Sequence, residues 1–135
     1  KKIFIDSSVF IGFIDRADEN PPKAVKTMEN LAKVGYQLFT SSINVSEVYA
    51  ALVRETSSIV ALEFLQAILQ SDIEMILPQK ADYISAYRIL RSNREKQLTL
   101  KEALNATLMQ KRGIFKIITF AYWHNLLGTM QSLIA

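Results

Sequence analysis

The stretch "IFIDSSVFIGFID" (Ile3–Asp15) is central to the fold, because a carboxylate interrupts an otherwise apolar run. Its first residues have the β-branched and aromatic content of a short buried strand. The residues that follow Asp6 predict a helix or a tight turn. A buried carboxylate is unfavourable without a partner, so Asp6 must be stabilised by groups from outside its own strand. Those groups must come from other segments of the chain.

The composition limits the possible classes of protein. The chain has 135 residues, 50% of them hydrophobic, and we expect a single domain over residues 1–135. It has no cysteine, which excludes a disulfide scaffold and a thiol nucleophile, and one histidine, which excludes a multi-histidine metal site. No segment reaches the roughly 18 consecutive apolar residues of a membrane span. We therefore expect a cytoplasmic protein with no membrane association.

The net charge of +3 is unevenly distributed along the chain. Residues 1–78 contain seven Lys or Arg and ten Asp or Glu, whereas residues 79–116 contain nine basic and three acidic residues. Residues 117–135 contain none of either kind. This asymmetry predicts two functional surfaces, although ordinary solvent-exposed helices would explain it equally well.

Segments with strand and helix patterns alternate along the chain. We expect strands at residues 1–6, 36–41, 73–78 and 115–120. We expect helices at residues 24–35, 43–55, 57–71, 80–93 and 98–113. The tail, residues 121–135, fits neither pattern clearly. This order predicts an α/β fold with a mostly parallel sheet that is covered on both faces.

Three acidic residues are expected at one edge of this sheet. Asp6 ends the first strand, whereas Glu47 and Glu102 lie in the first turns of two helices. The carboxyl ends of parallel strands lie along one edge, so the three side chains could converge there. Converging carboxylates repel one another, and a cation such as Mg²⁺ or Mn²⁺ stabilises them. A bound ion of this kind can activate water against a phosphodiester.

The same acids can also be interpreted as helix caps. Thr99 and Glu102 have the spacing of a capping box. Asn44 and Glu47 resemble one, with Asn as the cap. Asp6 could cap the segment that follows it, and carboxylates in a first helical turn interact favourably with the helix dipole.

Three segments, in this order, resemble the PIN domain, the metal-dependent nuclease fold of many bacterial and archaeal toxins of the VapC type. "IFIDSSVFIGFID" is similar to the family's opening strand, in which Asp6 and Ser8 match the motif. "TSSINVSEVYAAL" is similar to the second segment, with Glu47 as its acid. In "LTLKEALNATLMQKRGIFKIITF", Glu102 and Ala103 occupy the place of the family's Asp-Ala. The resemblance implies a three-layer α/β/α sandwich with a mostly parallel central sheet, and cleavage of RNA with Mg²⁺ or Mn²⁺.

The resemblance also implies residue roles and partners. Asp6, Glu47 and Glu102 would be catalytic, with Asp6 and Glu102 as metal ligands. The implied supporting residues are Ser8, Glu95 and Thr119. The implied partners are RNA, an antitoxin protein and a second copy in a homodimer. The apolar tail would belong to the core or would contact such a partner protein.

Two departures from the family pattern concern the acids. Glu102 is one methylene longer than the usual Asp, which displaces its oxygens by about 1 Å and disturbs Mg²⁺ geometry. Ala121 follows the fourth strand at a position where the family often has an acid. One hypothesis is therefore an active endoribonuclease, and another is a catalytically weakened PIN-like domain that binds RNA or protein. A phospho-acceptor domain that uses Asp6 ranks below both, because acids adjacent to Asp6 are missing.

An acidic site that receives a polyanion needs basic residues around it. Four of them fall on or just after the predicted helix at residues 80–93. These candidate nucleic-acid-binding residues are Arg88, Arg91, Arg94 and Lys96. Arg88 and Arg91 are three residues apart, so they share a helix face. They would bind the phosphate backbone, which carries no base sequence information.

Overall fold

The computed structural model describes residues 1–15, 20–121 and 131–134. The strands are β1 (Lys2–Ile5), β2 (Gln37–Ser41), β3 (Glu74–Ile76), β4 (Lys116–Ile118) and β5 (Gln131–Ile134). The helices are α1 (Ser7–Ile14), α2 (Pro21–Leu31), α3 (Ser42–Glu55), α4 (Ser58–Gln70), α5 (Lys80–Ser92) and α6 (Leu100–Lys111). A short 3₁₀ helix, η1 (Arg94–Lys96), connects α5 to α6.

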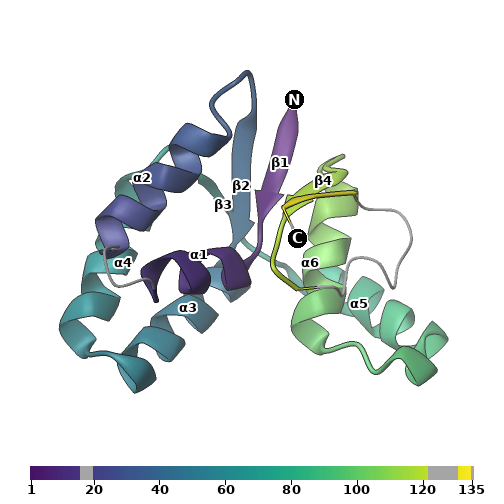
Figure 1. The fold of residues 1–135 in the computed structure, drawn as a ribbon. Helices are drawn as coiled ribbons and strands as arrows, with labels where there is room; N and C mark the ends of the chain where they lie inside the picture. The colour runs from purple at the N-terminus through teal and green to yellow at the C-terminus, as the bar shows by residue number, and fades with distance from the viewer. Residues whose placement is uncertain (16–19, 122–130, 135) are drawn as a thin grey trace.

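The strands form one sheet in the order β3-β2-β1-β4-β5, and every neighbouring pair is parallel. Figure 1 shows α1 to α4 on one side of this sheet and α5 with α6 on the other. This arrangement confirms the predicted three-layer α/β/α sandwich. β1 occupies the centre of the sheet, so the residue that follows it lies between elements from both halves of the chain.

The alternation of side chains along β1 divides the core into two layers. Ile3 and Ile5 are buried in the cluster that faces α1 to α4, where the rings of Phe10 and Phe64 meet edge-on at 5.6 Å between centroids. Phe4 points to the opposite face and packs in the cluster that contains residues of α6. Burial of each such side chain stabilises the fold by about 1.5–3 kcal/mol. None of the described helices is long and apolar enough to cross a membrane.

The helix ends show which polar residues have a local role. The α3 N-cap is Ser41, whose Oγ accepts a hydrogen bond from the Asn44 amide at 3.1 Å. The interpretation of Asn44 as the cap is therefore wrong, and its side chain is buried. Asp6 occupies the N-cap position of α1, but its carboxylate makes no capping hydrogen bond. Thr99 and Glu102 form the predicted capping box of α6.

The tail supplies a strand that its sequence did not reveal. β5 pairs in parallel with β4, with a register irregularity between Ile117 and Ile118. Residues 122–130 lie outside the described residues, and with them most of the aromatic tail. Phe120 lies just before that segment and packs against Phe13, with 6.2 Å between ring centroids.

We predict that Gly12→Ala destabilises the protein. Alanine normally stabilises a helix by about 1 kcal/mol relative to glycine. Here its Cβ would lie 2.8 Å from Cε2 of Phe120, so we expect a net loss of about 1–3 kcal/mol in urea unfolding. The double variant Gly12→Ala/Phe120→Leu should recover much of that loss. Equal effects of Gly12→Ala in both backgrounds would contradict the steric explanation.

Candidate functional site

The carboxylate of Asp6 is fully buried at the carboxyl edge of the sheet and is held by hydroxyl groups. Its Oδ2 accepts hydrogen bonds from Thr119 Oγ1 at 2.7 Å and from Ser8 Oγ at 3.0 Å. Each of these hydroxyl oxygens also accepts a hydrogen bond from a backbone amide. The Phe120 amide donates to Ser8 Oγ at 3.0 Å, and the Ala121 amide donates to Thr119 Oγ1 at 2.9 Å. The end of β4 and the start of α1 thus orient Asp6 together, and we name Asp6, Ser8 and Thr119 the Asp6 unit.

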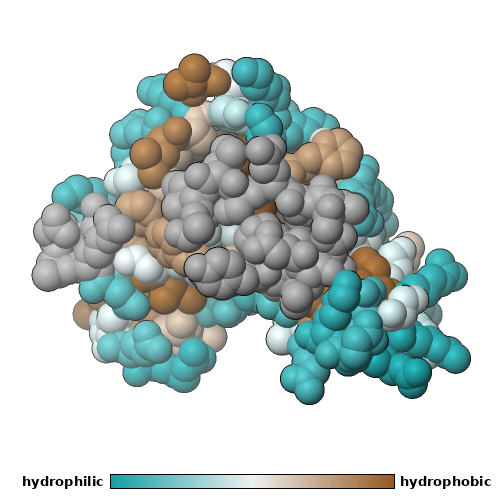
Figure 2. Space-filling model, turned by 45° about the vertical axis from the view of Figure 1, so that its right-hand side comes forward, coloured by the Kyte–Doolittle hydropathy of each residue, from teal (hydrophilic) through white to brown (hydrophobic). Residues whose placement is uncertain are grey.

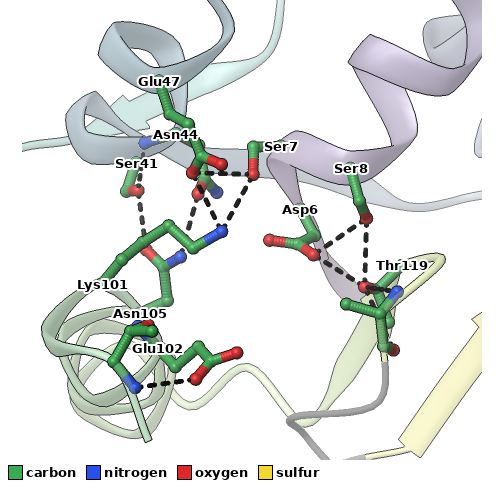
Figure 3. Close-up of polar contacts among 12 residues, drawn as sticks. Asp6, Ser7, Ser8, Ser41, Asn44, Glu47, Lys101, Glu102, Asn105 and Thr119 are labelled. Carbon is green, nitrogen blue, oxygen red and sulfur yellow. Dashed lines mark hydrogen bonds and ion pairs between the residues drawn. The ribbon is translucent and has the colours of Figure 1, made fainter. Parts of the chain in front are cut away.

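Glu47 faces the same edge from α3 and is paired with a lysine. Its Oε1 lies 2.9 Å from Lys101 Nζ and accepts a hydrogen bond from Ser7 Oγ at 3.1 Å. Lys101 Nζ also donates to Ser7 Oγ at 3.2 Å. Figure 3 shows the Lys101 side chain extending from α6 toward these two residues. We name Ser7, Glu47 and Lys101 the lysine cluster.

A buried amide network lies between α3 and α6. Ser41 Oγ donates to Asn105 Oδ1 at 2.7 Å, and Asn105 Nδ2 donates to Asn44 Oδ1 at 2.9 Å. Asn44 Nδ2 in turn donates to Thr40 Oγ1 and to the Ile5 carbonyl, both at 3.2 Å. These groups are fully desolvated, so each needs the partner that it has. The network fixes the start of α6 against the ends of β1 and β2.

Glu102 is not brought together with Asp6 and Glu47. Its Oε1 accepts a hydrogen bond from the Thr99 amide at 2.8 Å, while its own amide donates to Thr99 Oγ1 at 3.2 Å. In Figure 3 its carboxylate turns back toward the start of its own helix. Glu95, the other acid expected nearby, is exposed on η1. The structure therefore gives Glu102 a capping role.

The donor set does not fit a divalent ion in this arrangement. Mg²⁺ requires near-octahedral coordination by oxygen ligands. Glu47 is paired with a lysine, Glu102 bonds to its own helix, and Ala121 brings no carboxylate. Among the residues that the structure describes, no group of three acidic or histidine side chains could hold a metal ion.

Sequence reasoning overlooked Ser7, Lys101 and Asn105. Lys101 carried a signal, because a lysine in a first helical turn interacts unfavourably with the helix dipole and is unusual there. Asn105 stands among apolar residues of α6, which predicts a buried polar contact. Lys101 and Asn105 are four residues apart and share a helix face, so one rotation of α6 presents both to the site.

The predicted RNA-binding residues are exposed around the end of α5. Arg91 Nη1 donates to the Tyr87 hydroxyl at 3.3 Å, and Arg88 lines a cavity of about 520 Å³ between α5 and α6. Arg94 and Lys96 lie on η1, which leads into the first turn of α6. Figure 2 shows a largely hydrophilic surface at the lower right of the view, where this end of the molecule lies. The four basic residues thus lie on the segment that leads to the candidate site.

The opposite edge of the sheet has its own lysines. Lys116 Nζ donates to the Tyr36 hydroxyl at 3.0 Å, and Lys1 lies 5.7 Å from the centroid of the same ring. The hydrogen bond from Lys116 lowers the pKa of the Tyr36 phenol against an opposing effect of burial, and the positive charges of Lys116 and Lys1 lower it further. These groups lie at the starts of β1, β2 and β4, so they do not contribute to the site.

We predict that Asn105→Leu destabilises the protein by about 2 kcal/mol or more, because it removes partners from buried Ser41 and Asn44. The measurement is urea unfolding followed by circular dichroism. Thr107→Val is a matched control on α6, since the Thr107 hydroxyl donates to the Ala103 carbonyl one turn earlier in that helix. We expect this control to change stability by about 1 kcal/mol or less, because it removes one hydrogen bond and leaves no other side chain without its partner. An Asn105→Leu effect as small as that would contradict the structural role of the network.

We predict that Glu102→Ala lowers the free energy of unfolding by about 1 kcal/mol, because it removes half of the capping box. Glu102→Gln should retain most of the stability, since glutamine also serves at this position of a capping box. Thermal unfolding of both variants measures the difference. Equal losses in the two would show that the negative charge, rather than the cap, stabilises the helix.

Comparisons with known proteins agree with this architecture. A family model described as the PIN domain matches residues 3–120, whereas no curated protein matches the chain. Among solved structures, VapC20 of Mycobacterium tuberculosis, described as a sarcin–ricin loop cleaving toxin, is similar with a TM-score of 0.78 and 18% identity, over 96% of this chain and 97% of that one. VapBC2 of Rickettsia felis, bound to a DNA fragment from their promoter, is similar with a TM-score of 0.70 and 16% identity, over 98% of this chain and 97% of that one. Since the family model covers most of the sequence and both structures share its fold, this chain belongs to the PIN domain family.

Proposed function

We propose that this chain is a toxin-type PIN domain that binds RNA at the carboxyl edge of its sheet and has a weakened endoribonuclease centre. The pairing of Glu47 with Lys101 beside the retained Asp6 is the observation that carries the proposal. Membership of the PIN family and the likeness to VapC structures support a toxin–antitoxin context. An antitoxin is the corresponding protein partner. One domain over residues 1–135, a homodimer and a cytoplasmic location remain predictions.

RNA binding is supported by the position of the basic residues. The segment from α5 through η1 leads into α6, whose first turn holds Lys101. Arg88, Arg91, Arg94 and Lys96 are exposed on this segment. Their side chains are available to the phosphates of a single-stranded RNA that is bound at this edge. Such contacts neutralise phosphates, so binding should weaken as the salt concentration rises.

An active Mg²⁺- or Mn²⁺-dependent endoribonuclease is the second candidate, and the Asp6 unit favours it. Burial of a carboxylate lowers the stability of the fold, and a purely structural role for Asp6 would not require a charged side chain oriented by two hydroxyl groups. Activity would require other oxygen ligands to join Asp6. The side chains as described do not supply them, which is why the weakened centre is the first proposal.

We predict that the purified protein binds a long single-stranded RNA but, with Mg²⁺ or Mn²⁺, cleaves it only slightly faster than Asp6→Asn does, and no faster with EDTA. Gel electrophoresis measures cleavage. Efficient metal-dependent cleavage, complete within minutes and abolished by both EDTA and Asp6→Asn, would overturn the weakened-centre proposal in favour of the active nuclease. Cleavage that survives both would identify a contaminating nuclease.

RNA binding is measured in the same preparations by fluorescence anisotropy. Arg91→Gln/Arg94→Gln should weaken it by about tenfold, since each phosphate contact contributes through released counterions. Lys26→Gln/Lys33→Gln is a matched control, because these lysines line a cavity at the opposite edge with Tyr36. Equal losses in the two double variants would show only a net-charge effect and would contradict the proposed binding surface.

A further inference from the structure

The lysine cluster places a positive charge where a cation would be expected. Lys101 Nζ contacts two oxygen atoms, Glu47 Oε1 at 2.9 Å and Ser7 Oγ at 3.2 Å. Ser7 directly follows Asp6 in the chain, so Lys101 contacts the residue next to the buried carboxylate of the Asp6 unit. Figure 3 shows Lys101 directed into the space between the start of α1 and the first turns of α3. The start of α1 and α3, which both present oxygen atoms here, therefore meet a positive charge supplied by the protein itself.

The position of Lys101 is unfavourable for its helix. It is the second residue of α6, where the positive end of the helix dipole repels an ammonium group. An unconstrained lysine at this position would extend into solvent. Instead, the side chain is only 26% exposed and is fixed by two polar contacts. The attraction of Glu47 offsets the dipole, so the geometry depends on the acidic site.

A resident ammonium opposes the binding of a second cation. A like charge within about 4–6 Å disfavours the binding of a further positive charge. A divalent ion that approached Glu47 would have to displace Lys101 or bind beside it. The length and flexibility of the lysine stem would allow displacement, but at the cost of the ion pair.

We propose that Lys101 is the resident cation of this site, that it neutralises Glu47 in place of a divalent metal ion, and that its removal strengthens the binding of Mn²⁺ at this edge. The proposal rests on the proposed function only in placing the PIN-type site at this edge. It gives the weakened centre a second cause, Lys101, in addition to the missing acid at Ala121.

Binding of Mn²⁺ alone tests the proposal, with no RNA present. Free Mn²⁺ is measured by electron paramagnetic resonance during titration of the wild type and of Lys101→Gln. Lys101→Met is a second variant that keeps the apolar stem, and both residues are good helix formers. Lys111→Gln is the matched control, because Lys111 lies on the same helix and pairs with Asp82 at 3.4 Å, away from the cluster.

We expect Lys101→Gln and Lys101→Met to bind Mn²⁺ about tenfold more tightly than the wild type. Lys111→Gln should match the wild type. Adding Glu47→Gln or Asp6→Asn to Lys101→Gln should remove the gain, which would place the bound ion at this edge. Bound Mn²⁺ should also raise the melting temperature of Lys101→Gln more than that of the wild type.

Two results would overturn the proposal. One is an Mn²⁺ affinity of both Lys101 variants that equals the wild type's. The other is an equal gain in Lys111→Gln, which would reflect net charge alone. Failure of RNA binding would refute the proposed function without affecting this result, because the titration contains only protein and metal.

Discussion

The buried carboxylate of Asp6 is the constraint on which the rest of the site depends. It lies at the end of the central strand, where neither water nor the strand itself can stabilise it. Ser8 and Thr119 supply the required hydrogen bonds, and they come from positions 111 residues apart. The chain must therefore bring the end of β4 beside the start of α1. The hydrogen bonds to the Asp6 carboxylate thus connect the first and last parts of the region that the family model matches.

The amide network extends this constraint to the other half of the fold. Asn44 bonds to the carbonyl of Ile5, the residue before Asp6, and Asn105 bonds to Asn44. α3 and α6 are consequently fixed relative to the same strand end. A network of this kind is specific because every buried member needs its partner. An apolar contact at this place would tolerate rotation of α6, and the functional side chains would lose their positions.

The rotation of α6 decides the chemistry of the site. Lys101 and Asn105 share the face that is turned to α3, whereas Glu102 lies about 100° further around the helix. A PIN domain with a carboxylate directed inward would offer a metal ion several oxygen ligands. This chain offers an ammonium ion instead, paired with Glu47. The charge of Glu47 is therefore neutralised within the protein, whereas Asp6 is held by hydroxyl groups, and this is the physical basis of the weakened centre proposed above.

The order of strands and helices could be predicted from the sequence, because the underlying signals are local. The alternation around Phe4, the prolines at the start of α2 and the positive-φ glycines, Gly35 and Gly113, each act within a few residues. β5 could not be predicted, because a tail without charge or clear periodicity becomes a strand only through pairing with β4.

Some features of the candidate site could likewise be predicted from local sequence, and others depend on tertiary contacts. The sequence by itself determined that Asp6 ends a buried strand and that Glu102 can form a capping box, since both depend on neighbouring residues. Only the tertiary structure decided that Lys101, rather than Glu102, meets Glu47. The sequence does not show which of two adjacent charged residues on one helix faces α3. Ser7 and Glu47 decide this, and they are distant in the chain and close only after folding.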